Sequence, residues 1–141
     1  MTAMSYRMLG MMTDACPLTL ESLAQRLADG LPDTVRVERS PEVVRVIVGD
    51  LWSYVIGLSE AAHVQDESRE IANMFGRSID EKMQIGECKR RLETGGAADE
   101  SGAYAETFAQ ILAVLKSFEH LILFDVSEPK ILANTVPEGS G

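Results

Sequence analysis

Apolar residues near the C-terminal end of the chain recur with the period of a helix. Their positions are Tyr104, Phe108, Ile111, Leu112, Leu115 and Phe118. This spacing of three and four residues places them on one face of a helix. Residues 99–101 supply capping oxygens before that helix, and Lys116 lies in its last turn. The apolar run 121–124 is too short for another helix, so we predict that it is a strand buried on both faces.

Two other segments have the same helical spacing. The first runs from Thr19, a residue suited to an N-cap, to Gly30, a residue that commonly ends helices. The second runs from Ser59 to Gly76 and has a thinner apolar stripe opposite an acidic face. We predict a helix over each segment.

Alternating apolar and polar residues predict strands elsewhere in the chain. We expect such a strand over residues 34–39, and further strands over 5–12, where the apolar residues do not alternate regularly, and over 131–133, after a turn. Residues 77–94 fit two structures. One is a helix with an apolar face through Ile85 and Leu92, and the other is a strand over 87–94 with a bulge at Gly86. We favour the strand.

Residues 42–58 predict a β-hairpin. Two runs rich in β-branched residues flank Gly49-Asp50, a pair that suits a two-residue turn with glycine at its first central position. Such a turn pairs Val48 with Leu51. Because side chains alternate between the two faces of a strand, the core face then contains Val44, Val46, Val48, Leu51 and Val55. The opposite face contains Val43, Arg45, Ile47, Trp52, Tyr54 and Ile56.

Together these elements predict an α+β fold. We expect one domain over residues 1–141, with loose termini at 1–4 and 137–141. A mainly antiparallel sheet of about four to six strands, with about three helices packed on it, accounts for the predicted elements. A chain of 141 residues is long enough to bury roughly 70% of its unfolded surface in one core.

The chain is acidic, with 13 Lys and Arg against 22 Asp and Glu and a formal net charge of −9. This charge disfavours nucleic acid and anionic membranes as partners, because both require clustered cations. The apolar runs are far shorter than the ~20 residues of a membrane helix. Cys16 and Cys88 predict free thiols in a cytoplasmic protein. An acidic surface suits steering toward a basic protein partner, and it also maintains solubility.

The sequence contains no phosphate-binding glycine loop, nucleophile elbow or paired zinc ligands. We therefore predict neither a cofactor nor a metal. The nearest alternative is a small-ligand or metal-binding enzyme that uses His63, Asp66, Glu67 and Glu70, which lie on adjacent turns of one predicted helix. A solvated acidic face is the simpler interpretation. The three basic residues after Cys88 would lower the pKa of its thiol, whereas burial would make it a structural thiol.

The mixed face of the predicted hairpin is the candidate protein-binding surface. It contains Arg45, Ile47, Trp52 and Tyr54, and Trp, Tyr and Arg are the residue types enriched where interfaces bind most tightly. Acidic residues of the following helix extend this surface, namely Glu60, Asp66, Glu67 and Glu70. The alternative is that a helix covers the mixed face, so that Arg45 stacks on Tyr54 inside the fold.

The segment 88–93, the acidic loop after it and the helix, strand and turn that lead to Ile131 resemble in layout small acidic bacterial immunity proteins. Such proteins neutralise a toxin made by a neighbouring gene. The resemblance covers residues 86–133 and contains no diagnostic motif, so it assigns no role to any residue. It implies a non-enzymatic cytoplasmic inhibitor that binds one protein partner. A secretion-type chaperone and a structural homodimer are the alternatives.

Overall fold

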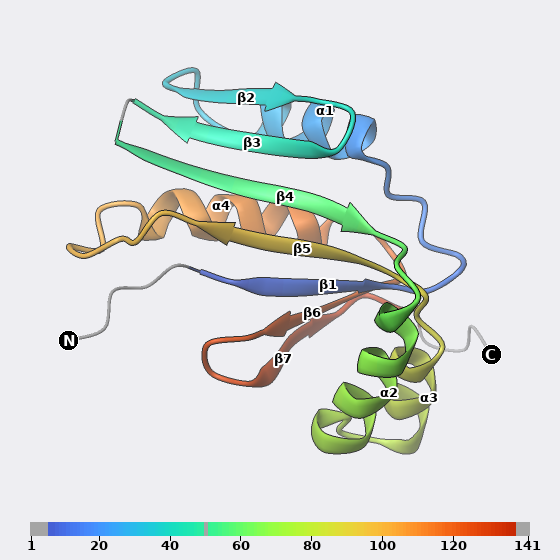
Figure 1. Ribbon diagram of the computed structural model, residues 1–141. Helices are drawn as coiled ribbons and strands as arrows, with labels where there is room; N and C mark the ends of the chain where they lie inside the picture. Colours follow the sequence, from blue (N-terminus) through green and yellow to red (C-terminus); the bar gives the residue numbers. More distant parts are fainter. Residues whose placement is uncertain (1–5, 50, 138–141) are drawn as a thin grey trace.

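A computed structural model describes residues 6–49 and 51–137 of the chain. These residues form one antiparallel sheet of seven strands in the order β2-β3-β4-β5-β1-β6-β7, together with four helices (Figure 1). The strands are β1 (Met8–Met12), β2 (Val35–Arg39), β3 (Val43–Val48), β4 (Trp52–Ser59), β5 (Arg90–Gly96), β6 (Leu121–Asp125) and β7 (Lys130–Asn134). The helices are α1 (Leu20–Gly30), α2 (His63–Phe75), α3 (Ile79–Gly86) and α4 (Ala105–Lys116). The α+β class is confirmed, with more strands and one more helix than predicted.

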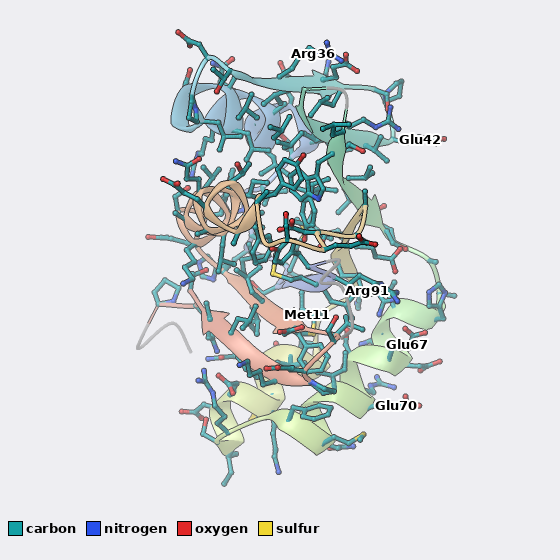
Figure 2. All side chains as sticks on the ribbon, turned by 90° about the vertical axis from the view of Figure 1, so that its left-hand side faces the viewer. Met11, Arg36, Glu42, Glu67, Glu70 and Arg91 are labelled. Atoms are coloured by element: carbon teal, nitrogen blue, oxygen red, sulfur yellow. The ribbon has the colours of Figure 1, made fainter. Side chains whose placement is uncertain are left out.

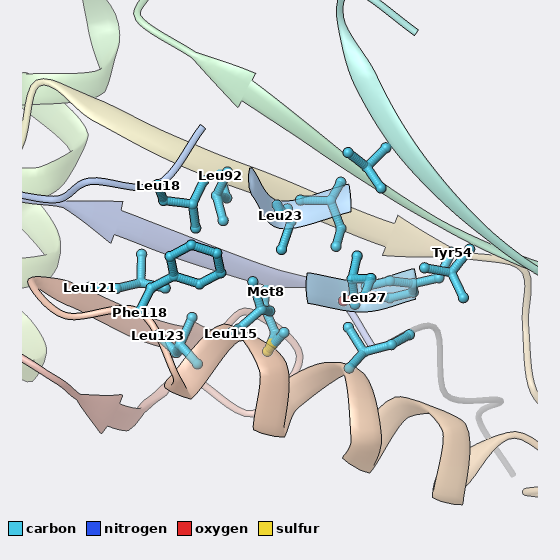
Figure 3. Close-up of a cluster of buried hydrophobic side chains, with 14 of the residues drawn as sticks. Met8, Leu18, Leu23, Leu27, Tyr54, Leu92, Leu115, Phe118, Leu121 and Leu123 are labelled. Atoms are coloured by element: carbon cyan, nitrogen blue, oxygen red, sulfur yellow. The ribbon is translucent and has the colours of Figure 1, made fainter. Parts of the chain in front are cut away.

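The main core lies between the sheet and the helices α1 and α4. Leu23 and Leu27 of α1 and Leu115 of α4 pack there against strand residues such as Met8 and Leu123 (Figure 3). The sequence explains α1 directly, because the Thr19 side chain accepts the Ser22 backbone N–H and so caps the helix.

A second, smaller core lies on the other face of the sheet. Ala72 of α2 and Ile85 of α3 pack there against Met11, Ile122 and Phe124 of the central strands. Strand β6 therefore contributes to both cores, since Leu121 and Leu123 point to the opposite side. The predicted burial of residues 121–124 on both faces is confirmed.

Residues 77–94 contain both structures that the sequence left open. Helix α3 occupies the first half of this segment, and β5 starts at Arg90, later than the predicted strand. The segment therefore adds a helix and a strand where one element was expected. Among the described residues, no helix has the length and apolar character needed to cross a membrane.

The predicted pairing of the hairpin is wrong by one residue. Val48 lies opposite Trp52, not Leu51, so three residues separate the paired strand ends. Gly49 has a φ of 58°, a left-handed conformation that glycine adopts without strain. A shift of one residue moves every side chain of β4 to the other face of the sheet. Trp52, Tyr54 and Ile56 therefore point into the main core with Val44 and Val46.

Candidate functional site

Trp52 and Tyr54, two of the predicted binding residues, are inside the fold. Their exposed fractions are 2% and 0%, so neither side chain is accessible to a partner. The Trp52 ring stacks on Tyr104 with 4.9 Å between ring centroids, and its indole N–H donates to the Ala97 carbonyl over 3.1 Å. The predicted placement of Trp52 and Tyr54 beside Arg45 is thus corrected.

Tyr54 makes polar contacts within the core. Its hydroxyl donates to the Tyr6 carbonyl and also hydrogen-bonds the Thr94 hydroxyl. Burial raises the pKa of Tyr54 well above its ordinary value. Its phenol is therefore neutral and serves to join β4, β5 and the segment before β1.

Arg45 and Ile47, the other two hairpin residues predicted for binding, do lie on the outward side of the sheet. Helices α2 and α3 cover the part of this side formed by β1, β6 and β7, and α2 also contacts β5 at Arg91. We call the remainder the open face, and its residues belong to neither core. They are Arg36, Glu38, Val43, Arg45, Ile47, Ser53, Val55, Gly57, Glu93 and Gly95. Val55, which was predicted to be a core residue, is therefore part of this surface.

A hollow of about 450 Å³ lies at the end of the open face next to the β3–β4 loop. Its lining combines apolar side chains with two arginines: Arg36, Arg45, Ile47, Gly49, Leu51, Trp52, Ser53, Val55 and Ala97. Leu51 was also predicted to be in the core, but it is 84% exposed. The hollow therefore combines an exposed aliphatic side chain with two guanidinium groups.

The positive charge on the open face is only partly neutralised. Arg36 pairs with Glu38 of the same strand, with 3.1 Å between Nε and Oε1. Arg45 is exposed and makes no ion pair with the described residues. The stem of Arg7 also reaches this face, since a Cβ on Gly95 would lie 3.6 Å from its Cγ.

The acidic residues predicted for binding lie on and next to α2. Figure 2 shows Glu67 and Glu70 on the same side of the molecule as Arg36. Glu60, just before the helix, and Glu70 are exposed. Asp66 lies 4.0 Å from Arg69. Acidic side chains of α2 therefore lie on the same side of the molecule as the open face.

Glu67 is engaged within the fold. It lies 2.8 Å from Nη2 of the buried Arg91, which also contacts Glu93 over 2.7 Å. This ion-pair network connects α2 to β5. His63 lies 3.9 Å from Glu67, and no group of three or more potential metal ligands occurs among residues 6–49 and 51–137.

Both cysteines are buried free thiols. Burial raises the pKa of Cys88 to about 12, which outweighs the opposing effect of Arg90. The alternative of a thiol activated by the neighbouring basic residues is therefore wrong, and the structural interpretation of Cys88 is confirmed.

Sequence reasoning missed Arg7, Arg36, Leu51 and Val55 as members of the outward surface. Arg36 was detectable, because the alternation over 34–39 separates it from Val35 and Val37. Leu51 and Val55 were not detectable, since the face of the sheet on which they lie depends on the length of the turn. Comparison of the chain with protein families, curated proteins and solved structures found no match.

Proposed function

We propose that the chain is a non-enzymatic protein-binding module and that the open face is its docking surface. The observation that carries the proposal is the incomplete cover of one side of the sheet. Helices α2 and α3 protect its lower part, whereas the open face presents Val43, Ile47 and Val55 beside the unpaired guanidinium of Arg45. These three aliphatic side chains are half-buried, and aliphatic surface grouped with arginine is typical of protein interfaces.

The charges on this side favour a partner of a particular chemistry. The partner's complementary surface has an aliphatic centre and a carboxylate that faces Arg45. On its other side it has Lys or Arg side chains that face Glu60 and Glu70 near α2. The net charge of −9 steers a basic protein toward the chain over longer distances.

In this proposal the module inhibits its partner by occupying the partner's site, as an immunity protein of a toxin system does, and it acts in the cytoplasm. Binding requires no movement of the sheet, because the open face is a rigid surface of paired strands. The residues expected to contribute most are Arg45 and Ile47, which lie on β3 and both line the hollow.

Affinity capture from native lysate with four variants tests the proposal. Arg45→Glu reverses the unpaired charge, and Ile47→Asp places a carboxylate in the aliphatic strip. Lys89→Glu and Ile79→Asp are matched controls, because both residues are exposed and lie away from the open face. We expect wild type and controls to capture the same stoichiometric partner. Arg45→Glu and Ile47→Asp should each lose about tenfold or more in affinity, as about 1.4 kcal/mol of lost binding energy implies.

The thermal unfolding midpoints of all four variants should stay close to that of wild type, which separates lost docking from lost folding. Equal capture by Arg45→Glu, Ile47→Asp and the controls would contradict the assignment of the open face. Absence of any stoichiometric partner would contradict the function itself.

A further inference from the structure

Strand β2 is at one end of the sheet, and no described strand pairs with its outer edge (Figure 1). The pairing with β3 shows which backbone groups point outward. The Ser40 N–H donates to the Val43 carbonyl, and in antiparallel pairs such hydrogen-bonded positions alternate with non-bonded ones. Arg36 and Glu38 therefore bond to β3, whereas the N–H and C=O groups of Val37 and Arg39 point away from the sheet.

The outer edge of β2 is suited to antiparallel pairing with a copy of itself. A two-fold axis at Val37 places Val37 opposite Val37 of the second copy, with two reciprocal hydrogen bonds. Arg39 then lies opposite Val35 of the second copy and donates its N–H to that carbonyl. The Val35 N–H already donates to the Pro32 carbonyl, so the pairing adds four backbone hydrogen bonds in total.

The same axis brings opposite charges together. It places Arg36 of each copy directly across from Glu38 of the other, at non-hydrogen-bonded positions, where side chains on neighbouring strands are closest. Both side chains are exposed, with 65% and 52% of their surface accessible. Charged side chains at a sheet edge normally oppose pairing with other chains, but here the sequence Arg-Val-Glu makes them complementary to a second copy.

The other edge of the sheet is less suited to pairing. The β6–β7 register shifts between Leu123 and Phe124, and such irregularities twist an edge away from partners. The Asn134 side chain of β7 is also bound to α3, because its amide donates to Glu81 and Gln84.

We propose that the chain forms a two-fold dimer through β2, which joins two seven-stranded sheets into one. The backbone hydrogen bonds of the dimer come from the outer edge of β2, which is not part of the open face, whereas the charge pairing uses Arg36 and Glu38, which are. Val37 belongs to the edge and not to the open face, so a change there separates dimer formation from the proposed docking function. The partner in this interface is a second copy of the chain, selected by the Arg36–Glu38 register.

Sedimentation velocity of the full chain at low ionic strength, over micromolar to several hundred micromolar concentrations, tests the dimer. We expect wild type to shift with concentration from 15.4 kDa to twice that mass. Val37→Pro removes the outward N–H without breaking a bond to β3, and this variant should stay monomeric. It should still capture the docking partner, which distinguishes the two proposals. Lys89→Glu, which lies outside β2, should dimerise like wild type.

Charge variants test the register. Arg36→Glu places two carboxylates opposite each other at both positions, and Glu38→Arg places two guanidinium groups there, so each variant alone should lose at least tenfold in dimer affinity. An equimolar mixture restores opposite charges at both positions and should dimerise with affinity close to that of wild type. A wild type that stays monomeric throughout would overturn the dimer. A dimer that Val37→Pro leaves intact, or a mixture that stays monomeric, would overturn the β2 interface.

Discussion

At the scale of single residues, the Tyr54 hydroxyl has the clearest energetic role. It contacts the Tyr6 carbonyl and Thr94 in the main core, where water cannot replace a lost hydrogen bond. Tyr54→Phe should therefore lower the free energy of unfolding by about 1–3 kcal/mol, measured by urea denaturation. Tyr104→Phe is the matched control. The Tyr104 hydroxyl makes no hydrogen bond with the described residues, and its loss should change stability by less than about 0.5 kcal/mol. Equal effects of the two substitutions would contradict this role.

The candidate site was partly predictable at this scale. Arg45 and Ile47 were assigned to the outward side correctly, since their placement depends only on alternation within β3. Trp52 was assigned by counting across a turn, and the structure buries it beside Tyr104. Trp and Tyr are enriched in cores as well as interfaces, so residue type could not correct the error.

At the scale of elements, α3 is held in place by Glu81. One of its carboxylate oxygens accepts the Arg77 backbone N–H over 2.9 Å and Nε over 2.8 Å. The other accepts Nη2 of Arg77 and the amide of Asn134 on β7. The Arg77 hydrogen bonds, more than any other cause, hold the pKa of Glu81 at about 2, below its ordinary value of 4.5.

This lowered pKa implies an acid-dependent contribution to stability. The contribution is complete above pH 4.5, the ordinary value, and is lost as the pH falls toward 2, the folded value. Because Arg77 is 60% exposed, solvent screening reduces the effect to about 2 kcal/mol or less. Urea denaturation should show that Glu81→Gln destabilises the protein at pH 6 and much less near pH 2. Asp80→Asn, a change at an exposed neighbour, should show no such trend. A constant effect of Glu81→Gln over this range would exclude the carboxylate as the cause.

The hairpin shows why the bounds of two strands were easier to predict than the register in which they pair. The bounds of β3 and β4 follow from β-branched runs, which are local properties of the sequence. Their register depends on whether two or three residues form the turn. The sequence Gly49-Asp50-Leu51 allows either, and the structure separates the paired ends by all three.

At the scale of the whole molecule, the order of strands was beyond sequence reasoning. Strand β1 is in the centre of the sheet between β5 and β6. Its pairing with β5 joins residues that are more than 80 positions apart in the sequence, such as Met8 and Thr94. Periodicity reports which residues face a core, but it does not report which strands become neighbours. The α+β class followed from the elements, whereas the incomplete cover of the sheet by α2 and α3 did not.

The two cores, on opposite faces of the sheet, divide the protein into two unequal packing units. The main core involves α1, α4 and most of the sheet, whereas α2 and α3 rest on a smaller cluster that includes Ile85 and Phe124. Helix α2 also lacks a side-chain N-cap. Since fewer buried apolar contacts give a lower free energy of local opening, we expect the amides of α2 and α3 to exchange with solvent faster than those of β1 and β6.

Hydrogen exchange measured by mass spectrometry, with two core variants, tests this division. Ile85→Ala removes a side chain of the smaller cluster, and a loss of about 2–3 kcal/mol there should raise exchange in residues 63–86 by roughly 30- to 150-fold. Exchange in β3 and β4 should stay close to that of wild type. Leu27→Ala acts on the main core and should raise exchange throughout the chain, because α2 and α3 have no sheet to pack on once β1 and β6 separate. A uniform increase with Ile85→Ala would show instead that both cores open as one cooperative unit.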